Sequence, residues 1–164
     1  MAWTKLRGGM ADLRGGQVTI FTKLGPVGLT FSSHGVTGLE LCRQPATAQK
    51  TPSFVRTAGR QLQLFATGKP VRFTAPLDLA AGTTFQQAVW RTLRKIPYGE
   101  TRTYAWVAKQ IGKPNAARAV GGACGANPTP IFVPCHRVVA SGGGLGGFSL
   151  GLPLKRRLLA LEAQ

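Results

Sequence analysis

Near Ala80-Ala81-Gly82 the pattern of apolar residues changes from one that includes several short strands to one that is helical, and this change constrains the fold most. Before it, short apolar runs have the character of half-buried β-strands. These runs lie at 18–22, 27–31 and 36–41. After it, apolar residues recur at helical spacing, first at Phe85, Val89, Leu93 and Ile96. We therefore predict an α/β protein with one domain at 1–82 and a second at 83–164.

The first domain is predicted to be a small antiparallel sheet with a helix. Leu24-Gly25-Pro26 and Ser33-His34-Gly35 separate the strand runs at the spacing of tight turns. Apolar residues recur at helical spacing from Pro52 to Thr67, and Gly68 ends the run. The segment 1–16 has four glycines and little periodicity, so we expect it to be loose.

Residues 103–123 have the pattern of a helix-turn-helix. Thr103 can cap a first helix, Gly112-Lys113-Pro114 can turn the chain, and Asn115 can cap a second helix. Two helices joined by a turn of three or four residues form a motif that binds DNA. The second helix consists mostly of small residues around Arg118, which would allow close approach to another backbone. Tight packing inside the protein is the alternative explanation.

The charge balance also favours a nucleic-acid partner. The chain has 21 Lys and Arg against 5 Asp and Glu, which gives a formal net charge of +16. Such an excess attracts polyanions, and counterion release makes nucleic acid the expected partner. Ribosomal proteins are basic for the same reason, so charge alone does not select DNA, and a generally basic surface with no dedicated partner is the alternative.

Composition argues against several other classes. No stretch approaches the roughly 20 apolar residues that cross a bilayer, and the segment 1–16 is charged where a signal peptide is apolar. We expect a cytoplasmic protein with no membrane partner. Cys42, Cys124 and Cys135 are widely spaced and odd in number, a pattern that favours free thiols over disulfides or a zinc site. We therefore expect no metal.

A thiol and an imidazole are adjacent in Pro134-Cys135-His136-Arg137-Val138, which follows the apolar run Ile131-Phe132-Val133. That run predicts a short buried strand. A cysteine is nucleophilic as its thiolate, which a neighbouring imidazole favours, so the pentapeptide predicts a nucleophile site. A terminal helix is expected to begin near Pro153. Glu162 lies beside its apolar stripe and can reach inward to orient the imidazole.

These motifs resemble those of the O6-alkylguanine-DNA alkyltransferases, also called methylated-DNA–protein-cysteine methyltransferases. The resemblance covers residues 85–164 closely and the sheet domain loosely. It implies a C-terminal helical domain of winged helix-turn-helix type that binds double-stranded DNA through the minor groove. It further implies direct-reversal repair: an O6-alkylated guanine is flipped out, and its alkyl group is transferred irreversibly to Cys135, once per molecule and without a cofactor.

The resemblance also implies individual roles. His136 would act as a base through water and Glu162 would orient it, while Tyr104 would give a proton or hydrogen bond to the leaving guanine. Asn127 would be a hinge, and Arg118 would be the finger that fills the gap left by the flipped base. The implied DNA contacts are Thr103, Tyr104, Ala117, Arg118, Ala119, Gly121 and Cys124. The implied substrate pocket is Pro130, Val138, Phe148 and Ser149.

Several alternatives stay open. A non-enzymatic alkyltransferase-like DNA-damage binder would keep the pocket and the arginine, but it would lack the cysteine found at position 135. A hydrolase using Cys135 and His136 is awkward, since neighbours on a strand point to opposite faces. Asn127 can be a simple turn residue, and Cys124 a small apolar side chain. We expect a monomer in solution; clustering on DNA and the preferred alkyl group are left open.

Overall fold

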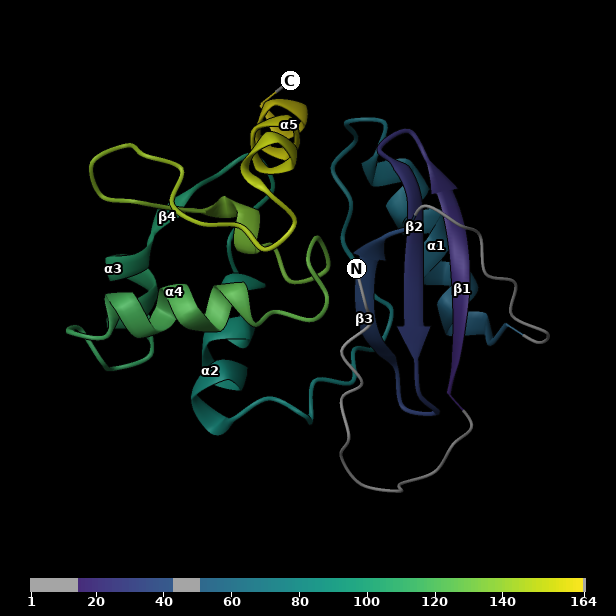
Figure 1. The fold of residues 1–164 in the computed structure, drawn as a ribbon, viewed down its shortest axis with the longest axis horizontal. Helices are drawn as coiled ribbons and strands as arrows, with labels where there is room; N and C mark the ends of the chain where they lie inside the picture. The colour runs from purple at the N-terminus through teal and green to yellow at the C-terminus, as the bar shows by residue number, and fades with distance from the viewer. Residues whose placement is uncertain (1–14, 43–50, 164) are drawn as a thin grey trace.

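The computed structural model describes residues 15–42 and 51–163. In Figure 1 the N-terminal sheet and the first helix lie on one side of the molecule, and the later helices lie on the other. Most of the predicted loose segment 1–16 is outside the described residues, but Gly16 already belongs to the first strand. Within these two described ranges, no helix combines the length and apolar character needed to cross a membrane.

The N-terminal part is the antiparallel sheet that the short apolar runs and their turns predict. Its order is β1-β2-β3, with β1 at Gly16–Thr22, β2 at Gly25–Phe31 and β3 at Val36–Leu41. Thr22 pairs with Gly25, so a two-residue turn joins the first two strands. Helix α1, Ser53–Phe65, packs against the sheet through its buried side. The predicted sheet with one helix is confirmed.

The C-terminal part is helical, as predicted. Helix α2, Thr84–Leu93, starts with a capping box in which Thr83 and Gln86 satisfy each other's backbone N–H groups. The predicted helix-turn-helix region contains α3, Tyr104–Gln110, and α4, Ala117–Gly125. The short strands β4, Arg102–Thr103, and β5, Val138–Val139, pair in parallel. The terminal helix α5 is Leu152–Glu162.

Two local predictions are wrong. Asn115 does not cap the second helix, because the Ala116 N–H donates to the Lys113 carbonyl and a closed turn leads into α4. The run Ile131-Phe132-Val133 is buried but is a turn, since Ile131 has φ of 77° and the Val133 N–H donates to the Thr129 carbonyl. A β-branched residue at positive φ is uncommon, and no local signal announces it.

This turn connects the two sides of the molecule. The Pro128 carbonyl accepts a hydrogen bond from the Leu39 N–H of β3 at 2.8 Å. Ile131 and Phe132 are buried in the core cluster formed by the sheet and α1, together with Leu158 of α5. Val133 belongs to the second core cluster, which lies among the helices. The segment that leads to Cys135 is therefore held by packing on both sides.

Candidate active site

Cys135, the predicted nucleophile, begins a single 3-10 turn, η1, at Cys135–Arg137. The side chain is only 2% exposed, yet the residue lines a cavity of about 250 Å³. His136 follows it on this turn and does not line that cavity. Because the two residues lie on a helical turn, the strand-based argument against a hydrolase does not apply. The other cavity-lining residues are Gly121, Cys124, Gly125, Gly147, Phe148 and Ser149.

Glu162 holds the last two residues of η1. Its Oε1 accepts hydrogen bonds from His136 Nε2 at 2.7 Å and from Arg137 Nη2 at 3.0 Å. Its Oε2 accepts from Arg137 Nε at 2.9 Å and from the Gly99 N–H at 3.0 Å. Arg137 Nη1 also donates to the Ile96 carbonyl at 2.7 Å. The buried carboxylate therefore joins η1, the end of α5 and the loop after α2.

The protonation of this group follows from its contacts. A carboxylate only accepts hydrogen bonds, so Nε2 of His136 carries the proton and Nδ1 is the acceptor. Among the described residues Nδ1 has no hydrogen-bond partner. Burial lowers the pKa of His136, and the contact with Glu162 offsets this only in part. Burial alone would raise the pKa of Glu162, but hydrogen bonds from His136 and Arg137 lower it to about 2. The result is a neutral imidazole beside a carboxylate.

Asn127 connects the end of α4 to the cysteine. Its Nδ2 donates to the Val133 carbonyl at 2.8 Å and to the Cys135 sulfur at 3.2 Å, and its Oδ1 accepts from the Thr129 N–H at 3.1 Å. Burial raises the pKa of Cys135, while the hydrogen bond from Asn127 and the charge of Lys155 act to lower it. At neutral pH the resting group is therefore a thiol whose deprotonated form already has a donor in place.

Replacing Asn127 with alanine is expected to reduce the free energy of unfolding by about 2–4 kcal/mol, because the Thr129 N–H and the Val133 carbonyl would lose their buried partner. The pKa of Cys135 should also rise. Urea unfolding and the pH dependence of iodoacetamide alkylation measure the two effects. Asn115→Ala at an exposed position is the control, with a change within about 0.5 kcal/mol. Equal stability of both variants would contradict the structural role given to the Asn127 hydrogen bonds.

Lys155 is a site residue that the sequence analysis missed. It lies on α5 and is fully buried. Its Nζ donates to the carbonyls of Val138 at 2.6 Å, Gly147 at 3.1 Å and Leu145. Three acceptors match the three N–H groups of an ammonium. Burial lowers the pKa of Lys155, whereas the nearby thiols of Cys135 and Cys124 raise it. The lysine therefore fixes the glycine-rich loop and provides positive charge near the sulfur.

Lys155→Met is expected to raise the pKa of Cys135 and to reduce the free energy of unfolding by about 1–3 kcal/mol, since buried carbonyls lose their donor. The pH dependence of thiol alkylation and thermal unfolding report the two changes. Arg156→Met, at an exposed position on the same helix, should alter neither. A thiol titration that is the same in both variants would rule out the electrostatic effect of Lys155.

A groove along α4 adjoins the thiol cavity. It has a volume of about 540 Å³ and shares Gly121 and Gly147 with that cavity. Tyr104 and the exposed Arg118 line it, as does Ala117. Burial raises the pKa of Tyr104, so its hydroxyl remains a donor at neutral pH. The groove therefore joins an exposed arginine to the cavity that contains Cys135.

The other predicted residues do not line the space in which they were expected. Pro130 and Val138 do not line the thiol cavity: Pro130 forms a bridge with Val133, and Val138 is buried in the second core cluster. Thr103 caps α3 by accepting from the Trp106 N–H, and neither it nor Ala119 lines the groove. Cys124 lines the thiol cavity instead of the groove.

Cys124 differs from Cys135 in its environment, although both line the thiol cavity. Burial and, to a smaller extent, the neighbouring Cys135 raise the pKa of Cys124 to about 12, although the charge of Lys155 acts to lower it. No side-chain hydrogen bond to its sulfur is found in the described part of the chain. Cys124 is therefore a thiol at neutral pH, and Cys135 is the better placed of the two for deprotonation.

Comparison with known proteins agrees with this geometry. The family model for the 6-O-methylguanine DNA methyltransferase, DNA binding domain, matches residues 84–164. The methylated-DNA–protein-cysteine methyltransferase of Mycobacterium tuberculosis H37Rv is 46% identical over 151 residues, which cover 88% of this chain and 90% of that protein. The chain belongs to the methylated-DNA–protein-cysteine methyltransferase family.

Other members of this methyltransferase family extend the comparison. The Methanosarcina barkeri protein of the same name is 43% identical over 149 residues, covering 87% of this chain and 94% of its own. The structure of Mycobacterium tuberculosis OGT in complex with DNA has a TM-score of 0.77 at 45% identity, with 88% of this chain and 91% of that chain covered. The resemblance inferred from the short motifs is confirmed over most of the chain.

The predicted absence of a metal site concerns side chains that commonly bind metal ions. Within residues 15–42 and 51–163, no group of three or more His, Cys, Asp or Glu side chains is placed to hold a metal ion. The absence of a metal and a cofactor remains a prediction.

Proposed function

We propose that this protein, a DNA-repair methyltransferase by family, transfers the alkyl group of O6-alkylguanine in double-stranded DNA to the Sγ of Cys135. The observation that carries the proposal is the placement of Cys135 in a cavity beside a His136–Glu162 pair with a free Nδ1. The S–C bond of the resulting thioether is not cleaved by water, even beside an imidazole and a carboxylate. Each molecule therefore acts once.

The site can account for the proton, the electron pair and the leaving group of the proposed transfer. The thiol proton passes through a water to Nδ1 of His136, and Glu162 stabilises the resulting imidazolium. The thiolate attacks the alkyl carbon, an S–C bond forms, and the C–O bond breaks with its electrons on the guanine. Tyr104 is the proposed donor to the guanine ring, because its raised pKa keeps the phenol protonated. Arg137 is a positioning residue through its two hydrogen bonds to Glu162.

DNA binding is assigned to the α4 groove. Arg118 is exposed and has no hydrogen bond or ion pair within the described residues, so it is available to enter the duplex as the finger. Small residues on α4 allow this helix to approach the minor groove of DNA closely. The base is expected to enter the thiol cavity between Gly121 and Gly147, which border both spaces. Phe148 and Ser149 would then contact it, and Asn127 would link α4 to the cysteine.

The domain boundary, the cellular location and the oligomeric state of the protein are also proposed. The family match starts at residue 84 and α2 at Thr84, which supports a domain boundary near 82. Cys42, Cys124 and Cys135 are free, which supports a reducing, cytoplasmic location. We propose a monomer in solution.

A duplex containing O6-methylguanine with a radiolabelled methyl group tests the function. We expect one labelled methyl per protein molecule, with no further transfer after the protein is consumed. Tight binding without transfer would instead assign a non-enzymatic damage binder. Repeated turnover that releases the methyl group would assign a hydrolase.

Arg118→Ala is expected to reduce repair in duplex DNA by about ten-fold or more, since filling the vacated base position repays part of the unstacking cost. Reaction with free O6-benzylguanine should change by less than about two-fold, because no base has to be flipped. Single-turnover rates for both substrates give the comparison. Lys109→Ala, at an exposed position of α3, is the control. Equal losses with both substrates would refute the finger role.

A further inference from the structure

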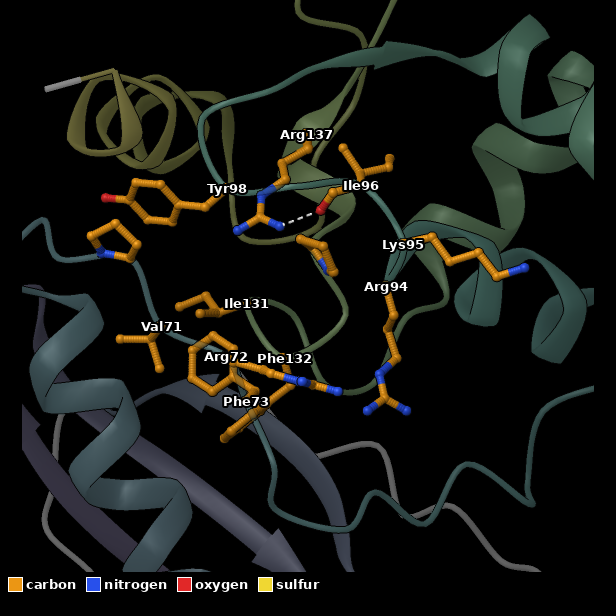
Figure 2. Close-up of a pocket in the computed structure, with 12 residues that line it drawn as sticks. Val71, Arg72, Phe73, Arg94, Lys95, Ile96, Tyr98, Ile131, Phe132 and Arg137 are labelled. Carbon is orange, nitrogen blue, oxygen red and sulfur yellow. Dashed lines mark hydrogen bonds between the residues drawn. The ribbon is translucent and has the colours of Figure 1, made fainter.

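A second, larger cavity lies away from the α4 groove. It has a volume of about 630 Å³ and shares no lining residue with the groove or with the thiol cavity. One wall is the segment 70–73 and another is 94–98 after α2, with Ile131 and Phe132 between them (Figure 2). We refer to this cavity as the basic cleft.

The charged residues of the basic cleft are all cationic. Arg72, Arg94, Lys95 and Arg137 line it, and none of its lining residues is acidic. In the part of the chain that the structure describes, the Arg72 and Arg94 guanidinium groups and the Lys95 ammonium make no hydrogen bond or ion pair. Arg72 and Arg94 are exposed, and in Figure 2 their side chains extend toward the same region, whereas Lys95 points away from it. Unpaired guanidinium groups facing a concave space suit a phosphate, which they bind bidentately.

The floor of the cleft is aromatic and apolar. Phe73 and Phe132 are in edge contact, with ring centroids 4.9 Å apart, and the Tyr98 ring lines the same space. Pro70 and Val71 complete this part of the wall. Aromatic side chains provide stacking surface for a nucleobase. The cleft thus has cations at its opening and rings at its base.

The basic cleft and the thiol cavity lie on opposite sides of the turn η1. Pro134 and Arg137 line the cleft, whereas Cys135 lines the thiol cavity. Residues i and i+3 of such a turn share one face, so η1 separates the two spaces. Arg137 is the direct connection, because its guanidinium donates to Glu162 and also borders the cleft.

We propose that the basic cleft binds a nucleoside phosphate, with the phosphates on Arg72 and Arg94 and the base against the aromatic floor. The same chemistry can come from a free nucleotide or from the phosphorylated end of a DNA strand. Every contact of this proposed ligand is with a residue that lines the cleft. Binding in the cleft does not depend on alkyl transfer to Cys135.

Isothermal titration calorimetry of the full-length protein with dATP tests the proposal. We expect saturable binding, and weaker binding of deoxyadenosine and of tripolyphosphate alone, because each retains only half of the contacts. Arg72→Glu/Arg94→Glu should weaken dATP binding by about ten-fold or more. The control Arg60→Glu/Arg91→Glu has the same net charge and changes two exposed arginines that do not line the cleft. It should leave the affinity within about two-fold.

The source of the phosphate is tested with duplexes that carry either a 5′-phosphate or a 5′-hydroxyl. A preference for the phosphorylated end that only the Arg72→Glu/Arg94→Glu variant loses would identify the strand end as a ligand. Equal weakening of dATP binding in both double variants would show attraction by overall charge and overturn the site. Absence of dATP binding together with indifference to the 5′-phosphate would also overturn it. Methyl transfer by both double variants shows that they are folded.

Discussion

Replacing Cys135 with serine is expected to abolish methyl transfer while leaving binding to undamaged duplex DNA within about two-fold. A serine hydroxyl ionises far less readily than a thiol, so the neutral imidazole of His136 cannot generate a comparable nucleophile. The α4 groove, to which we assign DNA binding, does not include residue 135, which is why binding should persist. Single-turnover transfer from a labelled O6-methylguanine duplex and a gel-shift titration measure the two properties.

The other cysteines are the matched controls for this experiment. Cys42→Ser and Cys124→Ser should both retain transfer to one methyl per molecule. Cys124 is the stricter control, because it lines the same cavity but has its pKa raised to about 12 by burial. Transfer that survives in Cys135→Ser and disappears in Cys124→Ser would move the acceptor to position 124.

Glu162→Gln is expected to lower the free energy of unfolding by about 3–5 kcal/mol and to slow transfer by about 10²–10⁴-fold. The amide would leave the buried Arg137 without its counter-charge and would turn an N–H group toward existing donors. His136 would also lose the carboxylate that orients it. Chemical denaturation and single-turnover rates of the folded protein are the measurements. Glu100→Gln removes an exposed ion pair with Arg102 and should change stability by less than about 1 kcal/mol.

The same variant has a pH signature. The pKa of Glu162 is about 2 in the folded state against 4.5 for an ordinary glutamate. A depressed carboxyl pKa adds stability above about pH 4.5, and that stability is lost as pH falls from 4.5 toward 2. The lowered pKa of His136 has the same sign, with loss beginning below 6.5. Glu162→Gln should therefore flatten the acid limb of the stability curve between 4.5 and 2. A limb of unchanged slope would contradict the ion-pair assignment.

The spacing of apolar residues, together with the residues at turns and helix caps, was sufficient to predict the main helices and strands. The strands of the sheet follow the short apolar runs and the turns between them, and the capped start of α3 follows from Thr103. The turn at Ile131 was not predictable, because an apolar β-branched run favours a strand and tertiary packing imposes the positive φ. The predicted Asn115 cap was wrong for a related reason, because a backbone turn replaces it.

The site was only partly predictable. Glu162 could be inferred from its place beside the apolar stripe of α5. Arg137 is separated from Glu162 by 25 positions, and no local rule pairs them. Lys155 precedes two exposed arginines in Lys155-Arg156-Arg157, so it resembles a solvated cation. Its burial depends on carbonyls of the loop at 145–147, which only the folded chain brings to it.

Peptide mapping by mass spectrometry tests the central claim most directly. The intact protein is incubated with excess duplex containing O6-methylguanine, digested, and searched for added methyl groups. We predict a single methyl per molecule, on the peptide that contains Cys135, with fragmentation placing it on the sulfur. A methyl on Cys42 or Cys124, or guanine repaired while every peptide stays unmodified, would contradict transfer to Cys135.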